Sequence, residues 1–202
     1  MNNVLITGSN GFIGSNILEG ALLNDKVILI LRRKDNKKKF NNKKIKTLYF
    51  DNYNQLDKKL KKIKADIVIH CATHYIKDHK TEDISRFAES NILFGNIILD
   101  NLKNMKTKKF INFSTVWEDY NAVKNNNINL YSVYKKAYAL LINYYKKIIP
   151  GVFFYEIMLS ETFGINDKRQ KLINVLKNNY KANKSTKINS SNLSINLLNV
   201  KD

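Results

Sequence analysis

The sequence predicts an α/β fold built on a doubly wound parallel sheet. Short apolar runs alternate with longer segments of helical periodicity, which is typical of this class. Glycines recur three residues apart between the first apolar run and the first helical segment. One proline and seven glycines among 202 residues are few for a many-turned sandwich, so an all-β fold is disfavoured.

Six short runs are expected to form strands. Most are apolar at nearly every position, as strands covered on both faces should be. In chain order the predicted strands are Val4 to Thr7, Val27 to Leu31, Ile45 to Phe50, Asp66 to His70, Lys109 to Ser114 and Val152 to Leu159.

Longer segments with apolar residues three and four apart are expected to form helices between these strands. In chain order they are Ile13 to Leu23, Leu56 to Ile63, Ile84 to Leu102 and Leu130 to Ile148. After about Leu159 the alternation weakens. There, Lys171 to Asn179 is predicted helical, and an apolar segment, Ile195 to Val200, follows a polar loop.

The chain carries 35 basic and 17 acidic residues, and a net charge of +18 normally suggests a polyanionic partner. Only four of the basic residues are arginines, which leaves 31 lysines, whereas base and phosphate recognition favours arginine. We therefore expect no nucleic-acid partner. Because there is no signal segment and no apolar run of roughly 20 residues, we expect a cytoplasmic protein without a membrane partner.

Cys71 is the single cysteine, so neither an internal disulfide nor a paired-cysteine metal site can form. We expect it to be a small apolar side chain rather than a nucleophile. His70, His74 and His79 lack an accompanying carboxylate cluster at ligand spacing, so no metal site is expected.

The segment Thr7 to Gly14 predicts a phosphate-binding turn. A tight turn, a close approach of backbone to a diphosphate and close packing of helix on strand each require a residue without Cβ. The helix that follows offers unpaired N–H groups and its positive dipole end to the phosphates. Cofactor contacts are expected from Gly8, Asn10, Gly11, Phe12, Ile13 and Gly14.

Basic residues follow the second predicted strand, where NAD-binding proteins usually carry an acid that accepts the ribose hydroxyls. Arg32 and Arg33 instead suit a ribose 2′-phosphate, so NADP(H) is the preferred cofactor and NAD(H) the alternative. In the alternative, the arginines are surface cations and Asp35 reaches the ribose.

Tyr131 and Lys135 are four residues apart in a predicted helix, hence on one face. The pKa of tyrosine is about 10 in water, and a neighbouring ammonium moves it toward the range useful for proton exchange with a carbonyl. Ser114 and Thr115 close the fifth predicted strand at its carboxyl end, where ligands bind in such sheets. A hydroxyl there can hydrogen-bond the same substrate oxygen.

The order of these motifs resembles that of the short-chain dehydrogenase/reductase superfamily throughout the chain. The extended branch, the nucleotide-sugar epimerase/dehydratase family, is the closer likeness. It shares the turn at 7–14, the His70-Cys71-Ala72 strand end, and Asn91 with Gly95. Residues 110–117, 129–131 and 163–169 resemble reductases of the CDP-abequose and CDP-paratose synthase kind.

This resemblance implies NADPH-dependent reduction of a keto group on a nucleotide-linked deoxysugar, within deoxysugar and polysaccharide biosynthesis. Thr115, Tyr131 and Lys135 would form the catalytic triad, and Lys135 would also hold the nicotinamide ribose. Asp51 would lie near the adenine, a helix-capping role being the alternative. Substrate contacts are expected from Ser114, Trp117 and Arg169, with a core position as the alternative for Trp117.

Related dehydratases carry an Asp-Glu pair directly after the threonine, where this chain has Val116 and Trp117, so dehydration is disfavoured. Two rivals stay open: an NAD-dependent nucleotide-sugar epimerase, and a dinucleotide-binding protein that has lost catalysis.

Residues 1–160 are expected to form the dinucleotide-binding domain, and 161–202 the beginning of a substrate-binding lobe that continues further in family members. The helices predicted at Ile84 to Leu102 and Leu130 to Ile148 carry apolar stripes broader than packing on a sheet requires. In related enzymes such helices pair across a two-fold axis, so a homodimer is expected.

Overall fold

The computed structural model describes residues 1–33, 40–165, 167–188 and 194–202. Asp35, the alternative ribose contact, lies outside the described residues, as does Asn166 of the 163–169 segment. The chain divides into two units, Met1–Met158 and Leu159–Asp202, and each is described by itself.

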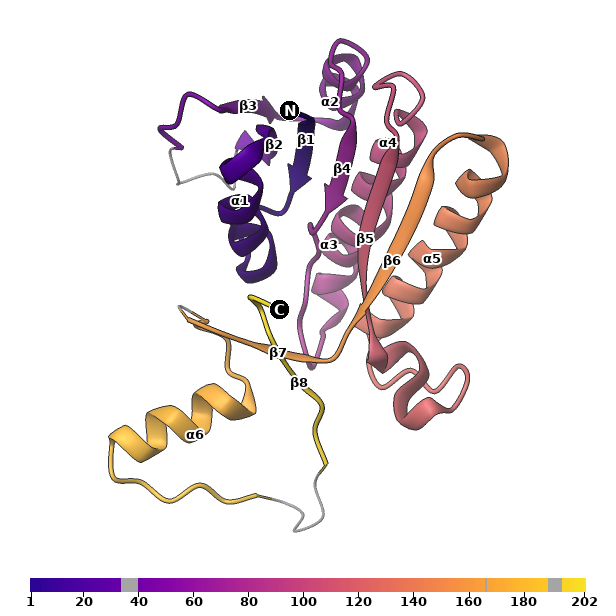
Figure 1. The fold of residues 1–202 in the computed structure, drawn as a ribbon. Helices are drawn as coiled ribbons and strands as arrows, with labels where there is room; N and C mark the ends of the chain where they lie inside the picture. The colour runs from indigo at the N-terminus through magenta and orange to yellow at the C-terminus, as the bar shows by residue number, and fades with distance from the viewer. Residues whose placement is uncertain (34–39, 166, 189–193) are drawn as a thin grey trace. The chain divides into compact units, whose positions relative to one another are not determined.

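The first unit is built on a six-stranded sheet in the order β3-β2-β1-β4-β5-β6 (Figure 1). β1 pairs in parallel with both β2 and β4, β2 pairs with β3, and β4 pairs with β5. The strand order reverses between β1 and β4, so the predicted doubly wound parallel sheet is confirmed. The strands are β1 (Asn3–Thr7), β2 (Lys26–Arg32), β3 (Ile45–Phe50), β4 (Ile67–His70), β5 (Lys109–Thr115) and β6 (Phe153–Leu159).

The helices of this unit fall close to the predicted segments, with one difference. The segment predicted as one helix from Ile84 contains a π-helical turn, Glu89–Leu93, between two α-helices. The α-helices are α1 (Phe12–Asn24), α2 (Tyr53–Leu60), α3 (Ile84–Ala88), α4 (Phe94–Asp100) and α5 (Leu130–Ile148), and two 3-10 helices, Thr81–Asp83 and Val116–Ala122, lie outside the predicted segments.

The sheet of the first unit has a hydrophobic cluster on each face, because neighbouring side chains of a strand point in opposite directions. Leu5 of β1 belongs to the cluster that packs under α2, α4 and α5, whereas Val4 and Ile6 belong to the cluster under α1. All three side chains are at most 2% exposed. The carboxyl ends of β1, β4 and β5 are thereby fixed relative to the starts of α1 and α5 (Figure 1).

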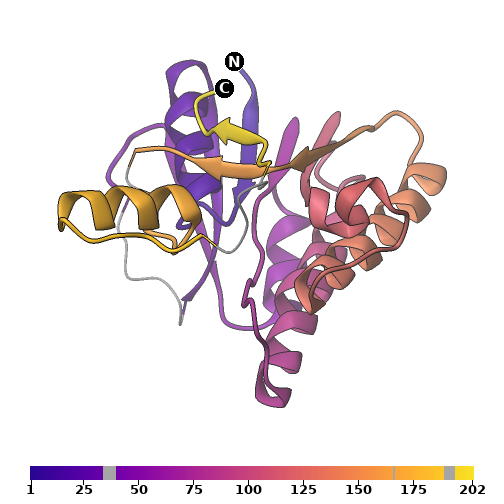
Figure 2. The ribbon, with the colours of Figure 1, turned by 90° about the horizontal axis from the view of Figure 1, so that it is seen from below.

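The second unit contains a two-stranded parallel sheet of β7 (Glu161–Phe163) and β8 (Leu197–Asn199), together with α6 (Leu172–Lys181) (Figure 2). Helix α6 and the apolar segment that holds β8 were predicted. β7 was not predicted separately from the strand that precedes it.

Candidate dinucleotide and catalytic site

The turn between β1 and α1 is closed so tightly that side chains are excluded at two glycines. Gly8 has φ +70°, and a Cβ there would lie 2.6 Å from the backbone nitrogen of Ala72. A Cβ on Gly14 would lie 2.3 Å from the carbonyl oxygen of Gly8. The Gly11 N–H donates to that same carbonyl at 2.9 Å. The backbone therefore bends as a diphosphate cradle requires.

The start of α1 suits an anion. Gly11 is the N-cap, and among the described residues no side chain caps the helix and no acid stands in its first turn. The Oγ of Ser9 is buried without a hydrogen-bond partner in the part of the chain described, which leaves a polar atom in the turn available to a ligand. Asn10 is exposed at the same turn. These residues fit the diphosphate of a dinucleotide.

Thr7 and His70 join the ends of β1 and β4 beneath this turn. The Thr7 hydroxyl accepts a hydrogen bond from the Ala72 N–H at 3.2 Å and lies 2.9 Å from Nδ1 of His70. Burial, with a smaller contribution from the charge of Lys135, lowers the pKa of His70 to about 3. A neutral imidazole can then accept the Thr7 proton, so this pair holds the glycine turn against Ala72.

The carboxyl ends of β2 and β3 bring together three predicted cofactor residues. Arg33 is 62% exposed, and its Nε lies 3.2 Å from the carboxylate of Asp51. The side chain of Arg32 is 15% exposed, pairs with Glu89 at 3.3 Å, and donates to the Tyr53 hydroxyl at 2.7 Å. Arg32 is therefore engaged within the protein, whereas Arg33 extends toward solvent.

The capping alternative for Asp51 is not what the structure shows. The N-cap of α2 is Asn52, whose side chain accepts from the Gln55 N–H at 2.9 Å. The Asp51 carboxylate lies beside Arg33 instead.

Helix α5 positions Tyr131 and Lys135 one turn apart. The helix begins at a capping box in which the Asn129 side chain accepts from the Ser132 N–H at 2.9 Å. Lys135 is 5% exposed, and its Nζ donates to the Phe113 carbonyl of β5 at 2.7 Å. The same Nζ lies 5.8 Å from the Tyr131 ring centroid. Burial lowers the pKa of Lys135 to about 8, and nearby Cys71 and carboxylates oppose this shift.

The end of β5 presents Thr115 and turns Ser114 inward. Thr115 is 7% exposed, and its Oγ1 accepts from the Trp117 N–H at 3.3 Å. The Ser114 hydroxyl donates to the carboxylate of Glu118, a buried residue that sequence reasoning missed. Its position four residues after Ser114 was the available signal.

Two aromatic rings, those of Tyr75 and Trp117, lie against the candidate catalytic phenol of Tyr131. Tyr75 meets Tyr131 edge to face at 5.1 Å and lies 5.9 Å from Trp117. Trp117 in turn meets Tyr131 at 6.4 Å. Trp117 is thus partly buried beside Tyr131, and its role in a substrate pocket stays a prediction. Tyr75 was missed because it lies in an irregular segment without periodicity.

Cys71 carries a partly buried thiol, and His74 is held through its backbone. Burial raises the pKa of the Cys71 thiol to about 12, so thiolate is scarce at neutral pH. The His74 backbone is bound by the side chain of Asn91, at 2.6 and 3.0 Å. Within the described residues no three histidine, cysteine or acidic side chains gather as a metal ion would require.

Arg169, the predicted diphosphate contact, belongs to the second unit and is held there. Its guanidinium pairs with Asp167 through two hydrogen bonds of 2.7 and 2.8 Å and donates to the Thr162 carbonyl at 2.9 Å. Its side chain keeps 34% exposure.

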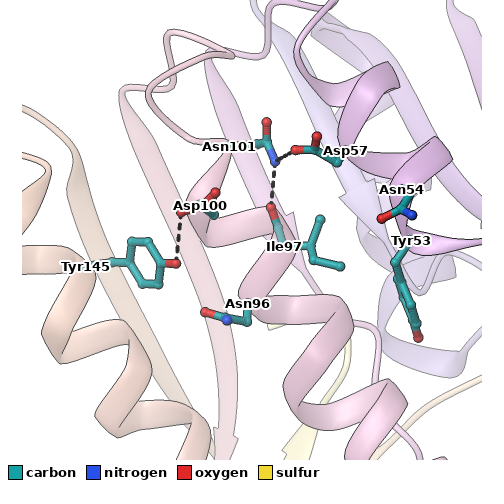
Figure 3. Close-up of a pocket in the computed structure, with 8 residues that line it drawn as sticks. All are labelled: Tyr53, Asn54, Asp57, Asn96, Ile97, Asp100, Asn101 and Tyr145. Carbon is teal, nitrogen blue, oxygen red and sulfur yellow. Dashed lines mark hydrogen bonds between the residues drawn. The ribbon is translucent and has the colours of Figure 1, made fainter.

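A cavity of about 280 Å³ lies between α2, α4 and α5 (Figure 3). Two pairs of its polar groups bind each other: Asn101 donates to Asp57 at 3.0 Å, and Tyr145 donates to Asp100 at 3.2 Å. None of the predicted site residues lines it. We assign it no part in the site at the strand ends.

No helix in the described part of the chain has both the length and the apolar character needed to cross a bilayer.

Known proteins share sequence with all or part of this chain. A profile of the NAD dependent epimerase/dehydratase family matches residues 4–202. A CDP-abequose synthase of Yersinia pseudotuberculosis is 26% identical over 203 residues, which cover 98% of this chain and 69% of that protein. A dTDP-D-glucose 4,6-dehydratase of Dictyostelium discoideum is 40% identical over 124 residues, or 55% of this chain and 28% of that protein.

Solved structures share the fold. A UDP-N-acetylglucosamine 4-epimerase from Methanobrevibacter ruminantium M1, in complex with UDP-N-acetylmuramic acid, superposes with a TM-score of 0.81 at 21% identity, covering 99% of this chain and 69% of that one. The Bordetella bronchiseptica enzyme WbmH, in complex with NAD+, gives 0.73 at 19% identity, covering 91% of this chain. The present chain spans only 64% of the WbmH chain.

Proposed function

The chain belongs to the NAD dependent epimerase/dehydratase family, and from this premise we propose that it binds NADP(H) and reduces a keto group on a nucleotide-linked deoxysugar. One observation carries the proposal. The hydrogen bond from Lys135 to the Phe113 carbonyl holds α5 against the end of β5, with the ammonium 5.8 Å from the Tyr131 ring. The phenol of Tyr131 thus lies beside the buried amine of Lys135, and Thr115 ends the strand that α5 packs on. A phenol in these surroundings can transfer a proton to a carbonyl.

In the proposed mechanism, the glycine turn would hold NADPH, which would provide the hydride for the reduction. Gly8, Gly14 and the start of α1 would hold the diphosphate. Thr115 would hydrogen-bond the substrate carbonyl and orient it. Tyr131 would donate its hydroxyl proton to the developing alkoxide, while the Lys135 ammonium stabilises the phenolate that remains.

The acids after β5 support reduction over dehydration. Glu118 and Asp119 are the first carboxylates after Thr115 in the sequence. Glu118 accepts from Ser114 in a buried position, and Asp119 pairs with Lys136 at 2.5 Å. Both carboxylates are thus occupied by partners within the first unit. This supports a reductase, although one relative named above is a dehydratase.

The NADP(H) preference rests on Arg33, whose exposed guanidinium could meet a 2′-phosphate. One observation favours the second candidate, an epimerase that retains NAD: Arg32 is already engaged by Glu89 and Tyr53. Purification separates the two, since an epimerase should carry bound NAD through chromatography whereas the reductase should not.

The proposed function is tested by NADPH oxidation against CDP-, dTDP-, UDP- and GDP-linked 4-keto sugars, with Tyr131→Phe as the diagnostic variant. We expect one substrate to turn over, and the variant to lose at least about 100-fold in kcat because its general acid is gone. NADPH affinity should be nearly unchanged. Tyr134→Phe is the matched control, because Tyr134 stacks on Phe87 instead. Full activity in Tyr131→Phe would remove this phenol from the mechanism.

A further inference from the structure

Three elements of the first unit each contribute one ring to an aromatic surface at the candidate catalytic site. Tyr75 comes from the irregular segment after β4, Trp117 from the segment after β5, and Tyr131 from the first turn of α5. The planes of the Tyr75 and Trp117 rings stand at 83° and 84° to that of Tyr131. Both rings therefore approach the same phenol edge to face.

This aromatic surface is in contact with solvent. Tyr75 is 44% exposed, and Trp117 and Tyr131 are partly buried. By contrast, Phe87, whose ring packs on the neighbouring His74, is fully buried. The aromatic surface also follows the carboxyl ends of β4 and β5, where ligands bind in doubly wound sheets. Its location and exposure suit a ligand contact better than a place in the core.

The position of Tyr75 is fixed through its neighbour His74. Asn91, which is 4% exposed, accepts from the His74 N–H at 2.6 Å and donates to the His74 carbonyl at 3.0 Å. The His74 ring meets Phe87 edge to face at 5.0 Å. Because the backbone and the side chain of His74 are both held, the Tyr75 ring is presented to Tyr131 without depending on a regular element.

Trp117 is fixed from the other side by Thr115. The Trp117 N–H donates to the Thr115 Oγ1 at 3.3 Å, and the ring lies 5.9 Å from that of Tyr75. The two rings beside the phenol are thus held in place by hydrogen bonds at the ends of two different strands.

We propose that Tyr75 is a substrate-contacting residue, which together with Trp117 binds the C–H groups of the sugar and holds its keto carbon beside Tyr131. The face of an aromatic ring carries partial negative charge and attracts polarised C–H groups. A deoxysugar, with fewer hydroxyls, presents more of them. The proposal rests on the proposed function, since it is Tyr131 that marks where the carbonyl would react.

Trp117 allows a direct test, because it is the only tryptophan of the chain. Its fluorescence can be excited at a wavelength that tyrosine does not absorb. We expect at least one of the CDP-, dTDP-, UDP- and GDP-linked 4-keto sugars to change this emission, and its nucleoside diphosphate alone to leave the emission unchanged. Titration then gives the affinity for the sugar nucleotide without any turnover.

Tyr75→Leu should bind the sugar nucleotide about ten-fold more weakly, because it keeps apolar bulk but lacks the ring face. Tyr75→Phe keeps the ring and should bind as the natural chain does. Tyr155→Ala is the matched control: Tyr155 is 46% exposed on β6, which begins beside the start of β5, since the Phe153 N–H donates to the Lys108 carbonyl at 2.8 Å. Its affinity for the sugar nucleotide should not change.

Three results would overturn the proposal: Trp117 emission that no sugar nucleotide changes beyond its nucleoside diphosphate, equal affinities in Tyr75→Leu and the natural chain, or an equal loss in Tyr155→Ala. A Tyr75→Leu variant without the native circular dichroism spectrum would assign Tyr75 a structural role and overturn it as well. If binding depends on the Tyr75 ring but no keto sugar is reduced, the contact stands and the proposed function fails.

Discussion

Among single residues, the candidate site combines two buried nitrogen bases with different tasks. His70 is 2% exposed and neutral, and it is bound to Thr7. Lys135 is similarly buried, but its Nζ donates to the Phe113 carbonyl, and the charges of carboxylates oppose the effect of burial on its pKa. Desolvation alone would neutralise both groups, so their neighbours decide which one keeps a proton near neutral pH. Sequence spacing identified Lys135 as functional, whereas the task of His70 depends on a partner 63 residues away.

The low pKa of His70 in the folded protein predicts that the protein loses stability in acid. Its pKa is about 3 in the folded protein and about 6.5 for a histidine in water, so the unfolded chain binds the additional proton between these limits. The contribution of His70 to the stability of the fold is fully present above pH 6.5 and is lost as the pH falls toward 3. From pH 7.5 to 5 the free energy of unfolding should fall by about 2 kcal/mol on this account. Urea titrations at several pH values measure it.

The comparison protein is His70→Gln, which cannot titrate and keeps a polar group near Thr7. Other groups also respond to acid, including His74, whose pKa is lowered by burial, and Glu118, whose pKa is raised by it. The difference between the unfolding free energies of the natural chain and the variant, taken at each pH, isolates the contribution of His70. Parallel pH curves for the natural chain and the variant would contradict the assignment.

At the scale of elements, the turn from β1 into α1 is where backbone geometry is most restrictive. We expect Gly14→Ala to destabilise the fold by about 1–3 kcal/mol, because its Cβ would lie 2.3 Å from the Gly8 carbonyl oxygen. Opening the turn should also weaken NADPH binding. Chemical unfolding and quenching of NADPH fluorescence measure the two effects.

Gly20→Ala is the matched control on the same helix. Apart from its chain neighbours and the helix's own backbone, no described heavy atom lies within 4 Å of a Cβ built there, so this change should stabilise the helix by about 0.5–1 kcal/mol and leave cofactor binding intact. If Gly14→Ala and Gly20→Ala had the same free energy of unfolding and the same affinity for NADPH, the steric explanation of the turn would be wrong.

Most elements could be predicted because their apolar pattern reflects burial directly. The prediction for β3 matches at both ends, and so does that for α5, where the Asn129 cap and the end of periodicity coincide with the helix. The π-helical turn at Glu89–Leu93 could not be predicted. It depends on a long-range contact, since Asn91 binds the His74 backbone and Gly95 leaves room for the Tyr138 ring.

The candidate site was predictable where its residues lie close together in the sequence, and not where the fold brings distant ones together. The glycine turn and the Tyr131-Lys135 pair are local patterns. Tyr75 beside Tyr131, and Arg32 engaged by Glu89, join residues more than 50 positions apart. No local periodicity encodes such contacts, so the fold had to be known first.

For the molecule as a whole, the remaining expectation is the homodimer. Helix α5 packs its buried face, which includes Tyr138, Ile142 and Tyr145, on the first unit. Its opposite side leaves a row of apolar side chains in solvent, each 46–69% exposed: Val133, Leu140, Tyr144 and Ile148. Residues at these spacings lie along one face of a helix. An apolar row of this kind is typical of a helix that pairs with another copy.

We therefore predict that the chain sediments at twice its monomer mass of 23.5 kDa, and that Leu140→Glu reduces it to the monomer. A carboxylate in the centre of a helix-to-helix interface would be buried without a partner, which costs several kcal/mol and exceeds what a modest interface can offset.

Leu23→Glu is the matched control, because Leu23 is 74% exposed on α1, across the sheet from α5. Sedimentation equilibrium at micromolar concentration distinguishes the outcomes. A natural chain that stays monomeric, or a Leu23→Glu variant that dissociates as readily as Leu140→Glu, would show that the exposed row on α5 does not mediate dimerisation.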